Sequence, residues 1–173
     1  RRGYKVTPVI ISNQRKKEFN KHLLLFFTGF SRISADIQKK TEANIANKTK
    51  ELLEMKSLVD EAEKILVSNG DLNEFGRLLH YTWDLKRGIS SAVSTDHIDD
   101  IYRRALRAGA TGGKLLGAGG GGFLLFFVEP DRQVAVLEEL SELLYVPFAF
   151  ENDGTHVIYF KAEDYSIPAQ YLK

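Results

Sequence analysis

Residues 112–128 read GGKLLGAGGGGFLLFFV, a glycine-rich run that leads directly into a strongly apolar segment. Glycine costs backbone entropy on folding, so four glycines in succession are hard to explain by stability alone. Without Cβ atoms, their amides can turn inward and approach phosphate oxygens closely. Residues 123–128 have the length and composition of a buried strand. The run therefore predicts a loop that contacts an anion or a substrate at the start of a strand.

A plain hairpin turn is the alternative interpretation of this run, and the glycines alone leave both open. Neither standard nucleotide fingerprint decides between them. A Walker A loop needs Lys followed by Ser or Thr after its last glycine, whereas Phe123 and Leu124 stand there. A Rossmann loop lies between a strand and a helix, whereas this loop leads into a strand. Spacing by itself predicts only a turn that suits a phosphate.

The apolar spacing outside the run predicts an α+β protein. Strands are expected at residues 5–11, 23–27, 146–150 and 156–160. Helices are expected at residues 13–21, in two pieces between 33 and 68 broken near Asn47, and at about 72–85, 97–108 and 131–144. The order of strand, helices, strand pair around the glycine loop, helix and terminal strands predicts a ferredoxin-like plan with extra helices.

Several polar residues and glycines mark the expected helix ends. Gly70 and Gly109 follow apolar periodic segments and are expected to end helices in the left-handed conformation. Asp71 and Asp131 are expected to cap the helices that follow them. One further helix has three N-cap candidates in succession, which are Ser94, Thr95 and Asp96.

Composition excludes several classes of function. The 173 residues carry 24 Lys and Arg against 23 Asp and Glu, so no strong field attracts nucleic acid or a membrane surface. No apolar run approaches the roughly 18 residues of a membrane helix. The absence of cysteine removes disulfides and thiolate metal sites and favours the cytoplasm. The start Arg1, Arg2, Gly3, Tyr4 resembles a cut through a longer chain.

No metal site is predicted. The four histidines lie in separate predicted elements without the spacing of paired metal ligands. Asp96, His97, Asp99 and Asp100 form an acidic cluster, but acidic residues at the start of a helix complement its dipole.

Five residues outside the glycine run are candidates for binding a substrate. Arg32 follows Thr28 and Gly29 just beyond a strand end, where its guanidinium could hold a sugar phosphate with two hydrogen bonds. An exposed arginine at a helix entry is the alternative. Trp83 and Lys86 share a helix face, so a sugar could stack on the indole while the ammonium meets a phosphate. Core packing for Trp83 and solvent exposure for Lys86 are the alternatives.

The glycine run from Lys114 onward resembles the third conserved motif of the GHMP family of galacto-, homoserine, mevalonate and phosphomevalonate kinases. That motif lies in the C-terminal domain of the family. LFFTGFSR at residues 25–32, WDLK at 83–86 and IDDIY at 98–102 ahead of AGA at 108–110 resemble the heptose 7-phosphate kinase branch. The similarity runs through nearly the whole chain.

The resemblance implies phosphoryl transfer from ATP with Mg²⁺ to a sugar hydroxyl, the anomeric one of a heptose 7-phosphate. It implies that residues 1–20 end a missing N-terminal domain and connect it to a C-terminal domain at 21–173. The missing half of such enzymes supplies the phosphate loop and the acidic residue near the acceptor, so this fragment holds no catalytic residue and is expected to be inactive alone. The residues that would buttress the phosphate loop are Gly117, Ala118, Gly119, Gly120 and Gly121.

The expected partners are the sugar phosphate and the missing kinase domain. An isolated half would also expose the surface that packs against its partner, so a homodimer is a further candidate. Two alternatives stay open. The acceptor could be fucose or another sugar, or the chain could be a ferredoxin-like module that binds a small anion.

Overall fold

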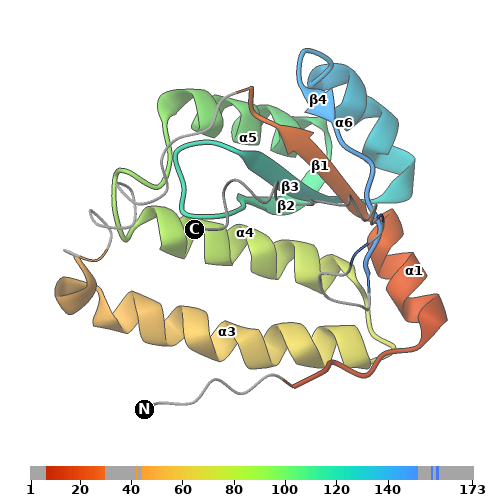
Figure 1. Ribbon diagram of the computed structural model, residues 1–173, viewed down its shortest axis with the longest axis horizontal. Helices are drawn as coiled ribbons and strands as arrows, with labels where there is room; N and C mark the ends of the chain where they lie inside the picture. Colours follow the sequence, from red (N-terminus) through yellow and green to blue (C-terminus); the bar gives the residue numbers. More distant parts are fainter. Residues whose placement is uncertain (1–6, 30–41, 43, 152–156, 158, 160–173) are drawn as a thin grey trace, which may run out of the picture.

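The fold is an antiparallel sheet flanked by helices, and the computed structural model describes it over residues 7–29, 42, 44–151, 157 and 159 (Figure 1). The helices are α1 (Asn13–Lys21), α3 (Thr49–Val67), α4 (Asn73–Arg87), α5 (Asp96–Ala108) and α6 (Gln133–Glu139), with 3₁₀ turns at Ile45–Asn47 and Pro130–Arg132. The strands are β1 (Leu23–Phe27), β2 (Ala110–Leu115), β3 (Phe123–Val128) and β4 (Leu144–Tyr145).

The sheet has the strand order β2-β3-β1-β4, and all neighbouring strands are antiparallel. The β1–β3 pairing runs from Leu23 opposite Phe127 to Phe27 opposite Phe123. The chain enters β1, passes through the helices to the β2–β3 hairpin, and returns through α6 to β4. This is the ferredoxin-like arrangement, elaborated with additional helices, so the predicted α+β fold class is confirmed.

Two apolar clusters cover the two faces of the sheet, because successive strand residues point to opposite sides. Leu24, Phe26, Leu124 and Phe126 lie in the larger cluster with residues of α5 and α6. The smaller cluster joins the opposite face to other elements through Phe19, Leu23, Leu72, Leu79 and Phe127. The sheet is therefore packed on both sides, but the smaller cluster lies only toward the end where α1 joins.

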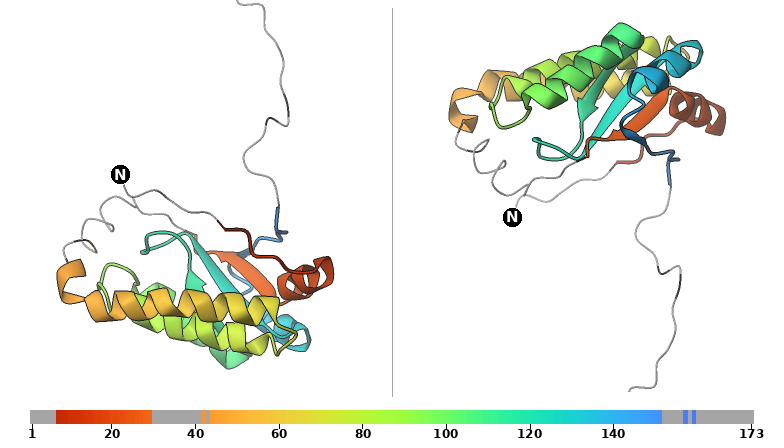
Figure 2. Two further views of the ribbon diagram at one scale, coloured as in Figure 1. Left: turned by 90° about the horizontal axis from the view of Figure 1, so that it is seen from below. Right: turned by 90° about the horizontal axis from the view of Figure 1, so that it is seen from above.

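Helix α4 runs alongside β2, and α3 packs against α4 on the side away from the sheet (Figures 1 and 2). Glycines make this approach possible. A Cβ atom at Gly112 of β2 would lie 2.0 Å from the carbonyl oxygen of Gly76 in α4. Side chains at these positions would push the helix away from the strand. The pair of glycines therefore fixes how closely the N-terminal half of α4 approaches β2.

Two of the predicted helix ends are confirmed. Thr95 caps α5 by accepting a hydrogen bond from the Ile98 amide at 3.3 Å, and Gly109 ends that helix with φ of +119°. Asp71 is not the N-cap residue of α4, which is Leu72, but its carboxylate accepts a hydrogen bond from the Asn73 amide at 2.9 Å, which lowers the pKa of the carboxyl. The expectation for Gly70 is wrong, because α3 closes at an extended Ser68 and Gly70 does not have a positive φ.

At the edges of the sheet, several predictions made from the sequence are wrong. Residues 7–11 form no strand, and Pro8 removes one of the amides that a ladder there would need. Helix α6 ends at Glu139 rather than near residue 144, and Asp131 lies in a 3₁₀ turn without capping it. Leu144 instead lies in β4 and pairs with Phe27 of β1. Pairing between strands thus overrides the helical spacing of the leucines.

The predicted terminal hairpin is not found in its expected form. Residues 146–150 are not a strand, although the Val146 amide donates to the Leu25 carbonyl at 2.8 Å and extends the contact of β4 with β1. The predicted strand at 156–160 and the turn residues Asn152, Asp153 and Gly154 lie largely outside the described residues. The predicted helix from residue 33 to Asn47 lies mostly outside them as well, whereas its continuation is confirmed as α3.

Replacing Gly112 by Ala should destabilise the domain strongly. The added methyl group collides with backbone atoms of α4, which cannot rotate away as a side chain can, so we expect a loss of about 3 kcal/mol in the free energy of unfolding. Gly70→Ala is the matched control, because its methyl group would meet only the Ser68 hydroxyl at 3.2 Å and should change stability by about 0.5 kcal/mol at most. Equal urea denaturation midpoints for the two variants would contradict the close approach of α4 to β2.

Candidate functional site

The glycine run forms the loop of the β2–β3 hairpin. Its base is closed by a hydrogen bond from the Leu116 amide to the Phe123 carbonyl at 2.8 Å. Four of its glycines have φ in the left-handed range, at Gly117 (+79°), Gly119 (+121°), Gly120 (+73°) and Gly122 (+107°). Only glycine adopts such angles at little cost, so the shape of the turn by itself explains most of the glycines in the run. The run therefore does form a hairpin turn, as the alternative interpretation predicted. A hairpin of this shape does not exclude that the loop also binds a ligand.

The middle of the loop is buried against the segment between α4 and α5. The Gly120 amide donates to the Val93 carbonyl at 2.9 Å, and a Cβ atom at Gly119 would lie 2.7 Å from the same oxygen. Gly119 and Gly120 are buried, whereas Gly117 is exposed. The loop therefore does not extend freely into water, because its centre packs against the protein and its first turn faces outward.

Thr28, at the end of β1, holds the other side of the loop. Its backbone amide donates to the Gly122 carbonyl at 2.9 Å. Its hydroxyl donates to the same carbonyl at 3.0 Å and accepts from the Gly122 amide at 3.0 Å. Thr28 is only 2% exposed, so these hydrogen bonds are shielded from water. Gly29 follows with φ of +84° and open space around it.

Lys86, in the last turn of α4, reaches the exposed turn of the loop. Its Nζ donates to the Gly117 carbonyl at 2.7 Å. Burial lowers the pKa of the Lys86 ammonium, and the nearby charge of Lys114 lowers it further. The lysine is half-buried, so the alternative of a solvent-exposed ammonium does not describe it. The structure thus brings a cation to the glycine hairpin.

Trp83 does not belong to this site. Its indole is 0% exposed and lies in the larger core cluster, with its ring centroid 6.0 Å from that of Tyr102. No face of the ring is free for a sugar, so the predicted stacking role is wrong and the core-packing alternative is correct. The reason is that α4 turns this part of its surface toward β2 and α5, while Lys86 lies at the rim. Arg32 lies outside the described residues.

Two residues of the site were not predicted. Val93 fastens the loop, and a valine in a connecting segment carries no sequence signal for such a contact. Lys114 lies in β2 opposite Leu125, on the face of the sheet that also carries Leu25. Its place directly before the glycine run could have drawn attention to it.

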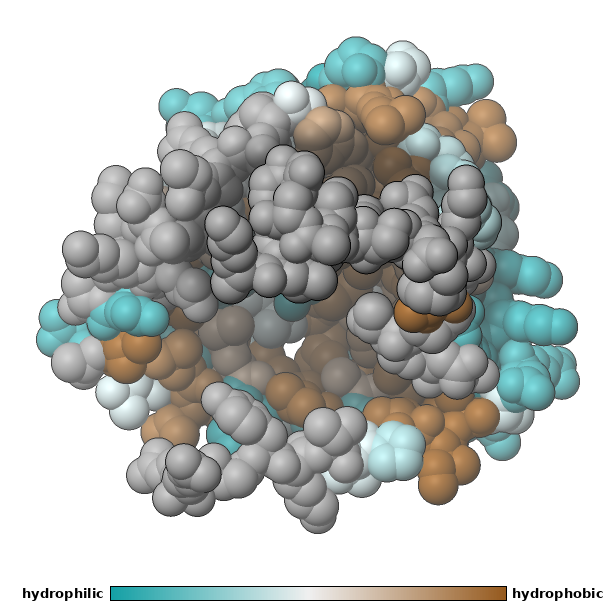
Figure 3. All heavy atoms as spheres, viewed as in Figure 1, coloured by the Kyte–Doolittle hydropathy of each residue, from teal (hydrophilic) through white to brown (hydrophobic). Residues whose placement is uncertain are grey.

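The face that carries Lys114 is apolar near the hairpin. Leu25 and Leu125 are half-buried there, and Phe123, at the start of β3, is 39% exposed. Figure 3 shows apolar residues recessed in the middle of the view. This surface differs from the opposite face of the sheet, which α5 and α6 cover.

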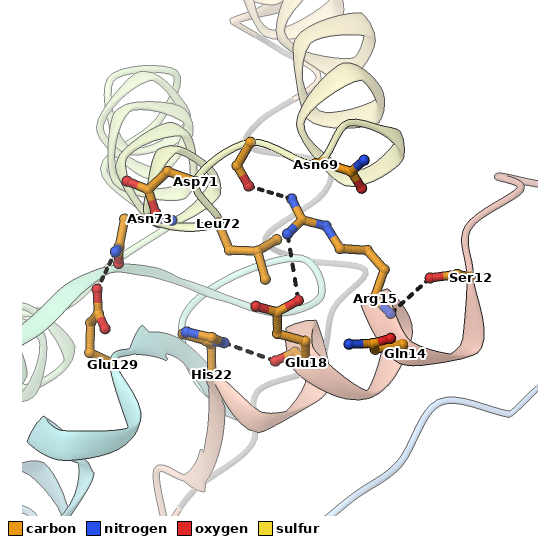
Figure 4. A pocket seen from close by; sticks show the side chains of 11 residues that line it. Ser12, Gln14, Arg15, Glu18, His22, Asn69, Asp71, Leu72, Asn73 and Glu129 are labelled. Atoms are coloured by element: carbon orange, nitrogen blue, oxygen red, sulfur yellow. Dashed lines mark hydrogen bonds and ion pairs between the residues drawn. The ribbon is translucent and has the colours of Figure 1, made fainter.

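A polar pocket of about 480 Å³ lies at the opposite end of the sheet, between α1, the α3–α4 connection and Glu129 after β3 (Figure 4). Arg15 enters it, but its guanidinium already donates to the carbonyls of Ile65 at 3.0 Å and Gly70 at 2.8 Å. On another side of the pocket, the Asn73 side-chain amide donates a hydrogen bond to the Glu129 carboxylate. These groups tie α1 and the end of α3 together, so we assign the pocket a structural role.

Among the residues that the structure describes, no three His, Asp or Glu side chains are grouped as metal ligands. Within the same part of the chain, no helix is long and apolar enough to cross a membrane.

Comparison with known proteins identifies relatives of the chain. The family model described as GHMP kinases C terminal matches residues 55–146. A D-glycero-alpha-D-manno-heptose 7-phosphate kinase of Campylobacter jejuni is 32% identical over 153 residues, covering 86% of this chain and 45% of that protein. An L-fucokinase/L-fucose-1-P guanylyltransferase of Bacteroides fragilis is 35% identical over 118 residues, covering 65% of this chain and 12% of that protein.

A solved structure shares the fold over most of the chain. The D-glycero-D-manno-heptose 1-phosphate kinase of Bacteroides thetaiotaomicron superposes with a TM-score of 0.59 and 25% identity, covering 90% of this chain and 42% of that one. The chain spans less than half the length of each of these relatives.

Replacing Thr28 by Val should loosen the glycine hairpin. Valine has nearly the same shape but leaves the Gly122 amide without its hydroxyl acceptor, so we expect a loss of about 1–2 kcal/mol in the free energy of unfolding. Amide hydrogen exchange should become faster at Gly122. Thr28→Ser keeps the hydroxyl and serves as the control. Unchanged exchange at Gly122 in the valine variant would contradict the role given to Thr28.

Proposed function

The chain belongs to the GHMP kinase family, and from that premise we propose that it forms the acceptor-side, C-terminal part of an ATP-dependent sugar-phosphate kinase. The proposed acceptor is a heptose 7-phosphate, at its anomeric hydroxyl. The match to the heptose 7-phosphate kinase of Campylobacter jejuni, which extends over 86% of this chain, supports this choice. That match covers 45% of the relative, which supports a longer protein as the active unit.

The observation that carries the proposal is the fastened glycine hairpin. Phosphoryl transfer is catalysed mainly by positioning and by neutralisation of charge, so a loop that borders the reacting groups must be held firmly. Thr28 and Val93 hold the loop from two sides, and Lys86 brings a positive charge to its exposed turn. The proposed support for the phosphate loop therefore comes from residues 117–121, with Thr28, Gly29 and Lys86 toward the substrate.

ATP and Mg²⁺ are the proposed cofactors. The ion would neutralise charge on the transferred phosphoryl group. The chain's own contribution is the backbone of the hairpin and the Lys86 ammonium, both of which suit phosphate oxygens. Most of the nucleotide site and the metal ligands are proposed to come from an N-terminal domain, so the 173-residue chain would be inactive alone.

We propose that residues 1–20 connect to an N-terminal domain and that residues 21–173 form the C-terminal domain, although Phe19 of α1 already packs into the smaller core cluster. The cytoplasm is the proposed location. The proposed partners are a sugar phosphate and the N-terminal kinase domain, with a homodimer as a further candidate.

A sugar kinase for fucose is the second candidate, favoured by the match to the bifunctional Bacteroides fragilis enzyme. Both candidates would use the same hairpin and would differ in whether the acceptor already carries a phosphate. A stand-alone module that binds a small anion remains the alternative from another class.

An assay of the protein extended upstream of Arg1 tests the proposal. We expect ATP consumption with heptose 7-phosphate, little with fucose, and none by the 173-residue chain alone. Turnover of fucose but not of heptose 7-phosphate would move the assignment to the second candidate. Phosphate binding without turnover of any sugar would favour the anion-binding module.

Arg32 keeps its proposed role in binding the phosphate of the acceptor. In the active protein, Arg32→Ala should raise KM for the sugar phosphate about tenfold or more while KM for ATP changes little, because a lost charge-assisted contact affects only the ligand it touches. Arg32→Lys, which keeps the charge but not the bidentate geometry, should recover only part of the loss. Equal effects on both Michaelis constants would remove this role.

A further inference from the structure

Two lysines from different elements lie near the exposed turn of the glycine hairpin. Lys114 lies in β2, three residues before Gly117, and faces the side of the sheet that carries Leu125. Lys86 comes from the end of α4 and donates to Gly117. Helix α4 packs along β2, so the two elements that carry these lysines are held side by side.

Bringing these two ammonium groups together is unfavourable for the protein alone. Like charges in a partly buried site repel, and the charge of Lys114 indeed lowers the pKa of Lys86 below the value that burial alone would give. Among the described residues, neither lysine forms an ion pair with a carboxylate. Asp84 is the acidic residue closest to Lys86 along α4, and it pairs with Arg87 at 3.6 Å and with His80 at 3.8 Å.

A structural role explains only part of this arrangement. The hydrogen bond to Gly117 accounts for one donor of Lys86, but an ammonium has three. It does not account for Lys114, which no described residue engages in an ion pair. Among the described residues, the space next to Gly117 itself is open, because a Cβ atom there would have no neighbour within 4 Å.

We propose that Lys86 and Lys114 together form a phosphate-binding subsite at the exposed turn of the glycine hairpin. A phosphate monoester carries about two negative charges near neutral pH and a polyphosphate carries more, so two ammonium groups can offset much of this charge. Its oxygens accept hydrogen bonds from both lysines. Lys86 uses N–H donors other than the one that it directs to the Gly117 carbonyl. Lysines act here as point charges without the planar geometry of arginine, so the subsite selects for charge more than for shape.

The identity of the phosphate rests on the proposed function. In a sugar-phosphate kinase it is either the phosphate that the acceptor already carries or a phosphate of ATP. Both present the same chemistry to the lysines. The experiment below therefore measures phosphate binding first and the source of the phosphate separately.

Binding is measured on the 173-residue chain with inorganic phosphate, by NMR of the lysine side-chain Cε and Nζ signals. Phosphate should shift the Lys86 and Lys114 signals together and raise the pKa of Lys86, because an anion offsets the repulsion. Lys114→Met and Lys86→Met keep most of the apolar stem, and each should weaken binding about tenfold. Lys17→Met, on α1 at the other end of the sheet, is the control and should leave binding unchanged. Unmoved Lys86 and Lys114 signals, or equal loss in all three variants, would overturn the subsite.

Thermal unfolding of each variant separates binding from folding. Removal of one of two repelling charges should leave the Lys114→Met chain at least as stable as the parent, since it loses no described ion pair. A variant that binds phosphate weakly but unfolds at the parent temperature supports the subsite. Weak binding that appears only together with a large drop in the unfolding temperature counts against it.

Kinetics of the active, longer protein then identify the source of the phosphate. If the acceptor supplies it, Lys114→Met should raise KM for the sugar phosphate about tenfold and leave KM for ATP unchanged; if ATP supplies it, the pattern reverses. Unchanged values for both would overturn the subsite as part of the enzyme. Absence of turnover in the parent protein would instead refute the proposed kinase, while the NMR titration would still decide whether the lysines bind phosphate.

Discussion

The attachment of the glycine hairpin to three separate elements is the constraint on which the site depends. A loop with four glycines at positive φ would be among the least ordered parts of an isolated hairpin, since glycine has the largest backbone entropy to lose. Thr28 from β1, Val93 from the α4–α5 connection and Lys86 from α4 each supply at least one hydrogen bond. These bonds convert a flexible turn into a positioned one.

The attachment requires that α4 and β1 lie where they do. Helix α4 is held by its close approach to β2, where Gly112 meets the backbone of Gly76. Strand β1 is held in the middle of the sheet between β3 and β4. The extra helices of the ferredoxin-like plan therefore have a function in this domain, because α4 delivers Lys86 to a loop that the plain plan would leave without it. The same packing of α4 on β2 places Lys86 near Lys114, and among the described residues neither lysine forms an ion pair.

Much of the fold could be predicted from local patterns. The apolar run Leu23–Phe27, the glycine after α5 and the Thr95 cap are each decided within a few residues, by burial, by φ and by one hydrogen bond. The errors fall where long-range pairing competes with a local pattern. The leucines near residue 144 have helical spacing, yet Leu144 joins β1, because completing the ladder satisfies backbone groups that a longer α6 would leave unpaired. Residues 7–11 have strand composition but form no described ladder.

For the site, the sequence by itself determined the unusual loop and its place between two strands, and it singled out Thr28, Gly29 and Lys86 as candidate contacts to a substrate. It did so because glycines in succession and a motif at fixed spacing are properties of the chain alone. Only the tertiary structure decided that the Trp83 indole faces the core while Lys86, three residues later, faces the loop, and that Val93 and Lys114 complete the surroundings. The physical reason is that one turn of a helix spans both environments, and which side is buried depends on the strand that the helix packs against.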